Sequence, residues 1–207
     1  MNSRPLAAHA EHPIEPVFRT PGARSASPAA RPYATPAARL YIAAEDTRLV
    51  GGATGEHGLE IAPGADRLLR EHFAQRLPQP VAIENAIMDI EDALAQVPAS
   101  VRGGAIASDD PALRRLALAA GLPADASTLH RDAIEQLFSR QAAVAEGRPA
   151  SAEGLPDDPR FVAELLVVRE LMHHLDIPRI QLDDGDRPGR DDRANTPQPE
   201  KTPCKAS

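Results

Sequence analysis

The fold is organised around the stretch Asp158–Leu175, which has the sequence DPRFVAELLVVRELMHHL. Its apolar side chains recur at helical spacing along one face, and further apolar residues flank that face. The residues at this spacing are Phe161, Leu165, Val168, Met172 and Leu175. A helix that is apolar over so much of its girth is usually buried in a protein core. We therefore expect it to be the central helix of one small domain, with Glu164 on its polar side.

Both ends of this stretch carry helix boundary signals. Asp158 is a favourable N-cap residue, and Pro159 suits the first turn, where its missing N–H costs no hydrogen bond. His173 and His174 lie in the last turn, where the helix dipole favours positive charge. They point about 100° apart, so they cannot share one metal from the same face. His174 follows Glu170 by four residues, which predicts a structural pairing of these two side chains.

Length and composition indicate one soluble domain. The chain has 207 residues and only 3% aromatic residues, so its core must come from Leu, Ile, Val and Ala. The net charge of −7 argues against a nucleic-acid or anionic-membrane surface, because both need a basic footprint. Cys204 is the only cysteine, which excludes an internal disulfide. Since no run is long and apolar enough for a membrane helix or a signal peptide, we expect a cytoplasmic protein.

Composition divides the chain into three segments. Residues 1–37 are rich in Pro and Ala, and we predict a disordered tail because they cannot bury enough apolar surface to offset their ordering entropy. A short docking motif at Ile14–Phe18 is an alternative for part of this tail. Residues 38–180 are predicted to form a single α+β domain, and residues 181–207 a second disordered, polar tail.

The predicted domain combines a small sheet or β-hairpin with about five helices. Apolar runs separated by polar or glycine-rich turns place the sheet at about residues 39–62, and a short buried strand at 103–107 can join it. The predicted helices cover residues 65–76, 81–97, 110–120, 127–146 and 159–175.

The predicted helix 81–97 has an acidic side. Its carboxylates are Glu84, Asp89, Glu91 and Asp92. A divalent cation needs such oxygen ligands, but it also needs a partner loop, so we interpret this side as the solvated face of an amphipathic helix. No set of Cys and His residues has the spacing of a zinc site. The sequence therefore predicts no metal and no cofactor.

Residues 113–131 resemble a helix-turn-helix motif at first sight. Ala117 and Gly121 have the separation that this motif requires. The linker after Gly121 is longer than usual, however, and the next helix is not strongly basic, so two packed helices are the preferred interpretation.

Two glycine-rich turns are candidates for binding phosphate through backbone N–H groups. They are Gly51–Gly55 and Gly103–Gly104. Neither contains the Gly-Lys-Ser/Thr sequence of a Walker loop or a complete G-x-G-x-x-G motif.

The segment Leu59–Leu68, LEIAPGADRL, precedes a predicted helix and then Pro78-Gln79-Pro80. This order resembles the strand, turn and helix in the second lobe of the exopolyphosphatase/guanosine-pentaphosphate phosphohydrolase family. Val101–Ala105 stands where that family has a phosphate-binding Gly-Gly loop, so the resemblance implies phosphate binding at Gly103 and Gly104. It spans about residues 39–177.

The chain also departs from that family. Ala43–Thr47 stands where the family has an acidic strand end followed by a glycine-rich loop. The family's first lobe, which supplies half of the phosphate site and the catalytic glutamate, is absent. If the kinship holds, this chain is half of a cleft, and no catalytic residue is carried over.

Three functions are therefore open. The leading interpretation is a small accessory or protein-interaction protein without catalytic chemistry, acting on a protein partner. The alternative is a phosphate- or nucleotide-handling enzyme of the phosphohydrolase type, completed by a second lobe or a dimer. A helix-turn-helix regulator is the third. The sequence does not decide whether the chain is an enzyme.

Overall fold

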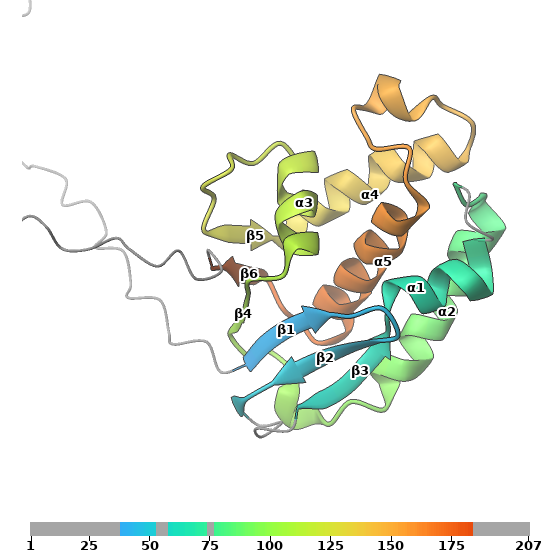
Figure 1. Cartoon of the computed structure of the whole chain (residues 1–207). Helices are drawn as coiled ribbons and strands as arrows, with labels where there is room; N and C mark the ends of the chain where they lie inside the picture. Colours follow the sequence, from blue (N-terminus) through green and yellow to red (C-terminus); the bar gives the residue numbers. More distant parts are fainter. Residues whose placement is uncertain (1–37, 53–57, 74–76, 184–207) are drawn as a thin grey trace, which may run out of the picture. The chain divides into compact units, whose positions relative to one another are not determined.

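A mixed six-stranded sheet forms one layer of the domain (Figure 1). The structure is a computed structural model that describes residues 38–52, 58–73 and 77–183. Both predicted tails, except residues 181–183, lie outside the described residues, as do the docking motif at 14–18 and part of the first glycine-rich turn.

The strands are β1 (Ala38–Ile42), β2 (Asp46–Val50), β3 (Leu59–Pro63), β4 (Ile106–Ser108), β5 (Thr128–His130) and β6 (Arg179–Leu182). Their order across the sheet is β3-β2-β1-β4-β6-β5. β4 pairs in parallel with both β1 and β6, whereas the β1–β2, β2–β3 and β5–β6 pairs are antiparallel. The predicted α+β class is confirmed, and the sheet is larger than the predicted hairpin.

Two strands were not predicted. β5 replaces the start of the predicted helix 127–146, and β6 continues to Leu182, two residues beyond the predicted end of the domain. The two strands pair with each other, with Leu129 opposite Ile180. Strands of three or four residues show almost no periodicity, and their partners are far away along the chain, so sequence patterns do not reveal them.

The α-helices are α1 (Ala65–Leu68), α2 (Pro80–Ala95), α3 (Pro111–Ala119), α4 (Arg131–Ala145) and α5 (Pro159–His174). α1 continues into a π-helical turn, η2 (Leu69–Phe73), and two 3₁₀ turns, η3 (Ala99–Val101) and η4 (Ala150–Glu153), lie in connections. Because β5 separates α3 from α4, residues 113–131 do not form a helix-turn-helix.

α5 is the central helix, as predicted. It packs against α1, α2, α3 and α4, and Figure 1 shows it between the other helices. Every residue of the predicted apolar face is buried. The placement of Glu164 on a polar side is wrong, because its side chain is also buried. None of the described helices has both the length and the apolar character that crossing a membrane requires.

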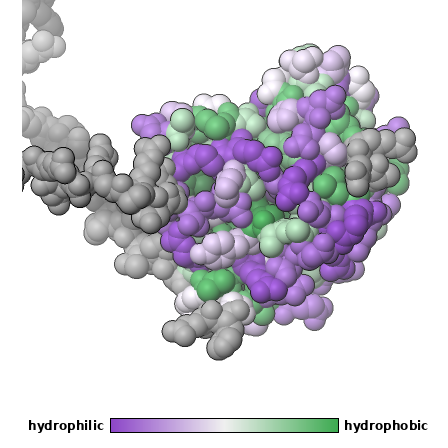
Figure 2. Space-filling view, viewed as in Figure 1, coloured by the Kyte–Doolittle hydropathy of each residue, from purple (hydrophilic) through white to green (hydrophobic). Residues whose placement is uncertain are grey.

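The strands β1–β3 have one buried and one exposed face. Leu40, Leu49 and Ile61 are buried in the core, while Tyr41 and its cross-strand neighbour Arg48 are exposed. This alternation is typical of a sheet with helices on one face and solvent on the other. The side of the molecule drawn in Figure 2 is mostly hydrophilic, with small separate apolar patches.

Candidate functional site at the carboxyl ends of β1 and β4

The chain leaves the neighbouring parallel strands β1 and β4 in opposite directions. After β1 it forms β2 and β3 on one side of the sheet, and after β4 it reaches β6 on the other. Ligands of open sheets bind outside the carboxyl ends of the strands at such a topological switch point. Six charged residues in α1, α3 and α5 or at their N-caps, here called the switch-point cluster, gather there: Asp66, Asp110, Arg115, Asp158, Arg160 and Glu164.

Glu164 lies at the centre of this cluster. Its carboxylate accepts two hydrogen bonds from Arg115 Nη2, at 2.5 and 2.6 Å, and one from Arg160 Nε at 3.2 Å. Only 3% of its side chain is exposed. Burial raises the pKa of Glu164 above its ordinary value, although the two guanidinium groups oppose this rise; the charge of Asp110 adds to it.

The two arginines reach solvent above the buried carboxylate. The exposed fraction of the side chain is 46% for Arg115 and 40% for Arg160. Arg160 also forms an ion pair with Asp66, and Arg115 Nη1 lies 3.9 Å from the carboxylate of Asp158. Guanidinium groups bind phosphate oxygens in the same forked geometry as carboxylates. Here that capacity is directed mainly at the protein's own acidic side chains.

The first N–H groups of α3 and α5 are capped by carboxylates. Asp110 accepts from Ala112 N at 2.8 Å, and Asp158 accepts from Arg160 N at 2.9 Å, which confirms the N-cap prediction for Asp158. Helix N-termini are ready anion sites because their first N–H groups have no partner within the helix. At these two helices, an incoming anion has to displace or avoid an internal carboxylate.

The N-terminus of α1 is closed by the β1–β2 turn. Ala65 N donates to Ala43 O at 3.3 Å, and Asp66 N donates to Ala44 O at 2.9 Å. This approach requires glycine at position 64, since a Cβ there would lie 2.4 Å from Ala43 O and 2.6 Å from Ala44 O. The carbonyl oxygens of the β1–β2 turn therefore cap the N-terminus of α1.

A further ion-pair group lies beside the switch point. Arg39 of β1 pairs with Asp109, which follows β4, at 3.3 Å, and with Asp183, which follows β6, at 2.9 Å. These ion pairs thus link the start of β1 to the carboxyl ends of β4 and β6.

The predicted phosphate loop lies at the other end of the strands, away from the switch-point cluster. Gly103 and Gly104 precede β4, so they are at its amino end. Gly103 has a φ of 69°, and its N–H donates to Leu175 O at 2.7 Å. The loop therefore packs on the C-terminus of α5, where Arg102 Nη1 also donates to His174 O. Phosphate binding at Gly103 and Gly104 stays a prediction.

The acidic side of α2 divides into exposed and paired carboxylates. Glu84 and Asp92 are exposed, as predicted for a solvated face. Asp89 Oδ2 lies 2.8 Å from His72 Nε2, whereas Glu91 Oε1 lies 3.3 Å from His174 Nε2.

The two histidines at the end of α5 face different partners. His174 Nε2 lies 3.9 Å from Glu170, so the predicted pairing is confirmed, while His173 pairs with Glu135 of α4. Sequence spacing did not indicate that Glu91 approaches this pair, because it comes from another helix more than seventy residues earlier.

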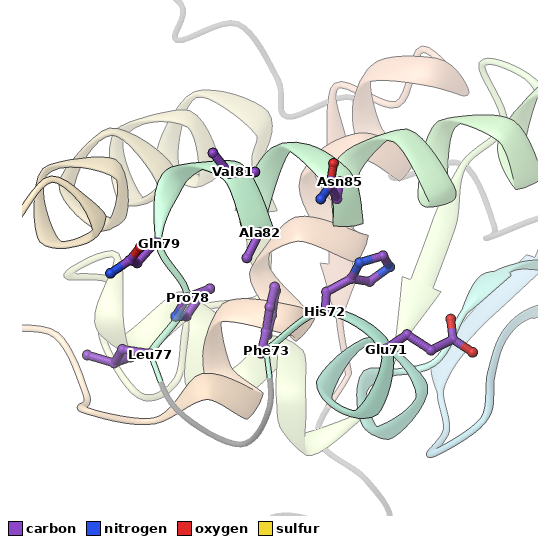
Figure 3. Close-up of a pocket in the computed structure, with 9 residues that line it drawn as sticks. All are labelled: Glu71, His72, Phe73, Leu77, Pro78, Gln79, Val81, Ala82 and Asn85. Carbon is purple, nitrogen blue, oxygen red and sulfur yellow. The ribbon is translucent and has the colours of Figure 1, made fainter.

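A pocket of about 400 Å³ lies between η2 and the start of α2 (Figure 3). Its described lining consists of Glu71, His72, Phe73, Leu77, Pro78, Gln79, Val81, Ala82 and Asn85. Apolar groups dominate the part near Phe73 and Ala82, while His72 and Asn85 add polar groups.

No protein-family model matches the chain, and no curated protein matches it in sequence. Solved structures do match its fold. The PPX-GPPA enzyme of Aquifex aeolicus has a TM-score of 0.55 and 13% identity, covering 71% of this chain and 52% of the enzyme. An exopolyphosphatase-like protein has a TM-score of 0.53 and 14% identity, covering 72% of this chain and 56% of that protein.

A further crystal structure of the Aquifex aeolicus Ppx/GppA family member gives a TM-score of 0.51 at 12% identity, covering 71% of this chain and 51% of that protein. At such identities the likeness is one of fold. The chain spans only about half the length of these structures, as a likeness to one lobe implies. The resemblance inferred from the sequence is thus confirmed for the fold: the chain is similar to part of a Ppx/GppA exopolyphosphatase protein.

Proposed function

We propose that the chain handles a phosphate-containing ligand, such as polyphosphate or a nucleotide, as one lobe of a phosphohydrolase-type cleft. The observation that carries this proposal is the likeness of fold to a PPX-GPPA enzyme and an exopolyphosphatase-like protein over about half of their length. A second lobe or a second copy of the chain completes the cleft.

The switch-point cluster is the proposed contact with the ligand. Arg115 and Arg160 present partly exposed guanidinium groups, and Glu164 holds both in place. The cluster contains four carboxylates and two arginines, so by itself it repels a bare phosphate group. This imbalance supports a cleft to which a second surface contributes further positive charge or N–H donors.

Calorimetric titration of the full chain with polyphosphate and with nucleoside triphosphates tests this proposal. We expect saturable binding that weakens at least about tenfold in Arg115→Gln and Arg160→Gln, because each loses a charge-assisted contact worth about 1.5–3 kcal/mol. The matched control is Arg148→Gln, which removes an exposed arginine paired with Glu153 outside the cluster.

Two results would count against this assignment. Absence of binding would refute a phosphate ligand for the chain alone, and repeating the titration at high protein concentration would include any dimer. Equal binding by all arginine variants, together with a loss in Gly104→Ala, would move the ligand to the predicted loop at Gly103 and Gly104. That glycine has no positive φ, and an added Cβ meets nothing closer than Val101 O at 3.4 Å, so the variant should fold.

A protein-interaction role without catalytic chemistry is the second candidate. It is favoured by the capping of three helix N-termini at the switch point by the chain's own acceptors, which leaves few free donors for an anion. A pull-down followed by mass spectrometry, with and without competing polyphosphate, separates the candidates. A partner captured equally in both conditions, by a chain that binds no phosphate compound, would support this second role.

A further inference from the structure

Three potential metal ligands meet between α2 and α5, at the opposite end of α5 from the switch-point cluster. They are Glu91 of α2 and Glu170 and His174 of α5, and one ligand atom of each lies within 4.8 Å of the others. His174 Nε2 stands between the two carboxylates, 3.3 Å from Glu91 Oε1 and 3.9 Å from Glu170 Oε2.

These separations are close to those of a metal site. Zinc binds imidazole nitrogen and carboxylate oxygen at about 2.0–2.2 Å, which places neighbouring ligand atoms of a tetrahedral site roughly 3.4 Å apart. The ligand atoms of His174 and Glu170 lie 3.9 Å apart and all three lie within 4.8 Å, so an ion has to draw the carboxylates inward by side-chain rotation. All three residues belong to long helices, so their backbones are held by the core.

Glu170 is the most buried of the three ligands. Its side chain is only 4% exposed, and its Oε1 is ion-paired with Arg169. Its Oε2 faces His174 Nε2 at 3.9 Å, in the direction of the other two ligands. A carboxylate so shielded from water is stabilised by nearby positive charge, and a bound cation would add to the charge of Arg169.

The surroundings of Arg169 suit a supporting role. Its guanidinium group lies 4.1 Å from the centre of the Phe138 ring, and its Nε donates to Glu135 at 3.2 Å. These contacts fix the arginine, which in turn fixes one oxygen of Glu170 and aims the other towards His174. Partners that orient a ligand in this way are a regular part of metal sites.

We propose that Glu91, Glu170 and His174 bind a divalent transition-metal cation, with zinc as the best-matched ion. One imidazole and two carboxylates form a donor set that zinc accepts, and three protein ligands leave one position for water or a substrate oxygen. The ion joins α2 to α5.

The test uses the full chain with Cys204→Ser, which removes the only thiol. Cobalt(II) is added and visible absorption is recorded, followed by displacement with zinc and by zinc calorimetry. We expect one site with the absorption bands of four- or five-coordinate cobalt. His174→Ala and Glu91→Gln should each weaken zinc binding at least about tenfold.

Two histidine variants are the matched controls. His173→Ala removes the neighbouring imidazole, which pairs with Glu135, and His72→Ala removes the imidazole of the more exposed Glu71, His72 and Asp89 group. Both should bind zinc as the parent does, and circular dichroism checks that every variant is folded. Absence of binding, or binding that survives His174→Ala unchanged, would overturn the proposal, as would an equal loss in His173→Ala.

Discussion

The burial of Glu164 could not be predicted from the residues around it in the sequence. Glu164 forms an i, i+4 ion pair with Arg160, but its side chain is buried and not on the polar side predicted from the sequence. Its burial depends on Arg115, which is 49 residues away in α3 and delivers a second guanidinium group to the same carboxylate. Whether a polar residue within an apolar helix is buried depends on which residues pair with it in the folded structure. A single sequence does not identify those residues.

Removing one member of this group should cost more than the loss of a surface ion pair. We expect Glu164→Ala to lower the free energy of unfolding by about 1–3 kcal/mol, as for other buried hydrogen-bonded groups. Arg115→Met should lower the free energy of unfolding more than Glu164→Gln does. The first variant leaves a buried carboxylate with one arginine partner, whereas in the second the two arginines can turn towards water. Urea denaturation measures both, and a cost for Glu164→Ala below about 0.5 kcal/mol would show a surface residue.

The raised pKa of Glu164 predicts how its contribution depends on pH. The native state holds this proton more tightly than the unfolded chain, in which the carboxyl group has its ordinary value of 4.5. The stability of the protein relative to Glu164→Gln should therefore be greatest below about pH 4.5 and fall as the pH rises through the raised pKa. Denaturation curves at several pH values measure this difference. An increase with pH would mean that the two arginines stabilise the ionised form more than burial penalises it.

At the scale of elements, α5 was predictable because its apolar spacing, N-cap and proline all agree. Leu165→Ala should lower the free energy of unfolding by about 2–5 kcal/mol, since truncation leaves a cavity in the core. The control is Glu84→Ala on the exposed side of α2, which should cost less than about 0.5 kcal/mol. Thermal and urea unfolding compare the two. Normal stability of Leu165→Ala would contradict the central role of this helix.

The contact between the β1–β2 turn and α1 predicts a strict requirement for glycine. In Gly64→Ala, the new methyl group meets backbone carbonyl oxygens, so the hairpin or the helix must move. We expect a loss of about 1–3 kcal/mol, as for overpacked sites. Gly104→Ala, which has ordinary packing distances, should change the melting temperature little. Equal effects of the two substitutions would indicate that the close approach at Gly64 relaxes without cost.

The helices were easier to predict than the sheet for a physical reason. A helix of sixteen residues such as α2 repeats its apolar pattern several times, and proline or aspartate marks its start. β5 and β6 are too short for such repetition, and their pairing joins residues about fifty positions apart. The switch-point cluster likewise depends on contacts between helices that are far apart in the sequence. Its members therefore look like ordinary surface charges when only the sequence is known. Gly103 and Gly104 are candidates because a pair of glycines is visible in the sequence. Composition does not specify, however, that this pair lies at the amino end of β4.

For the whole molecule, we expect a protease-resistant core that coincides with the described domain. Residues 1–37 and the segment after Asp183 have the composition of tails, and exposed tails are the preferred sites of cleavage. Limited trypsin digestion followed by mass spectrometry should leave a fragment of about residues 38–183. Early cleavage at Arg160 or Arg169 within α5 would contradict one stable core.

The pairing of β5 with β6 also has a consequence for the order of events during synthesis. β5 leaves the ribosome before β6, its one hydrogen-bonded neighbour among the described strands, which emerges about fifty residues later. Until then, β4 likewise has one unpaired edge. Such late-closing contacts slow folding and expose strand edges to other nascent chains. A ribosome stalled before residue 182 has cleared the exit tunnel should therefore carry an incomplete sheet, which β6 completes by pairing with β4 and β5.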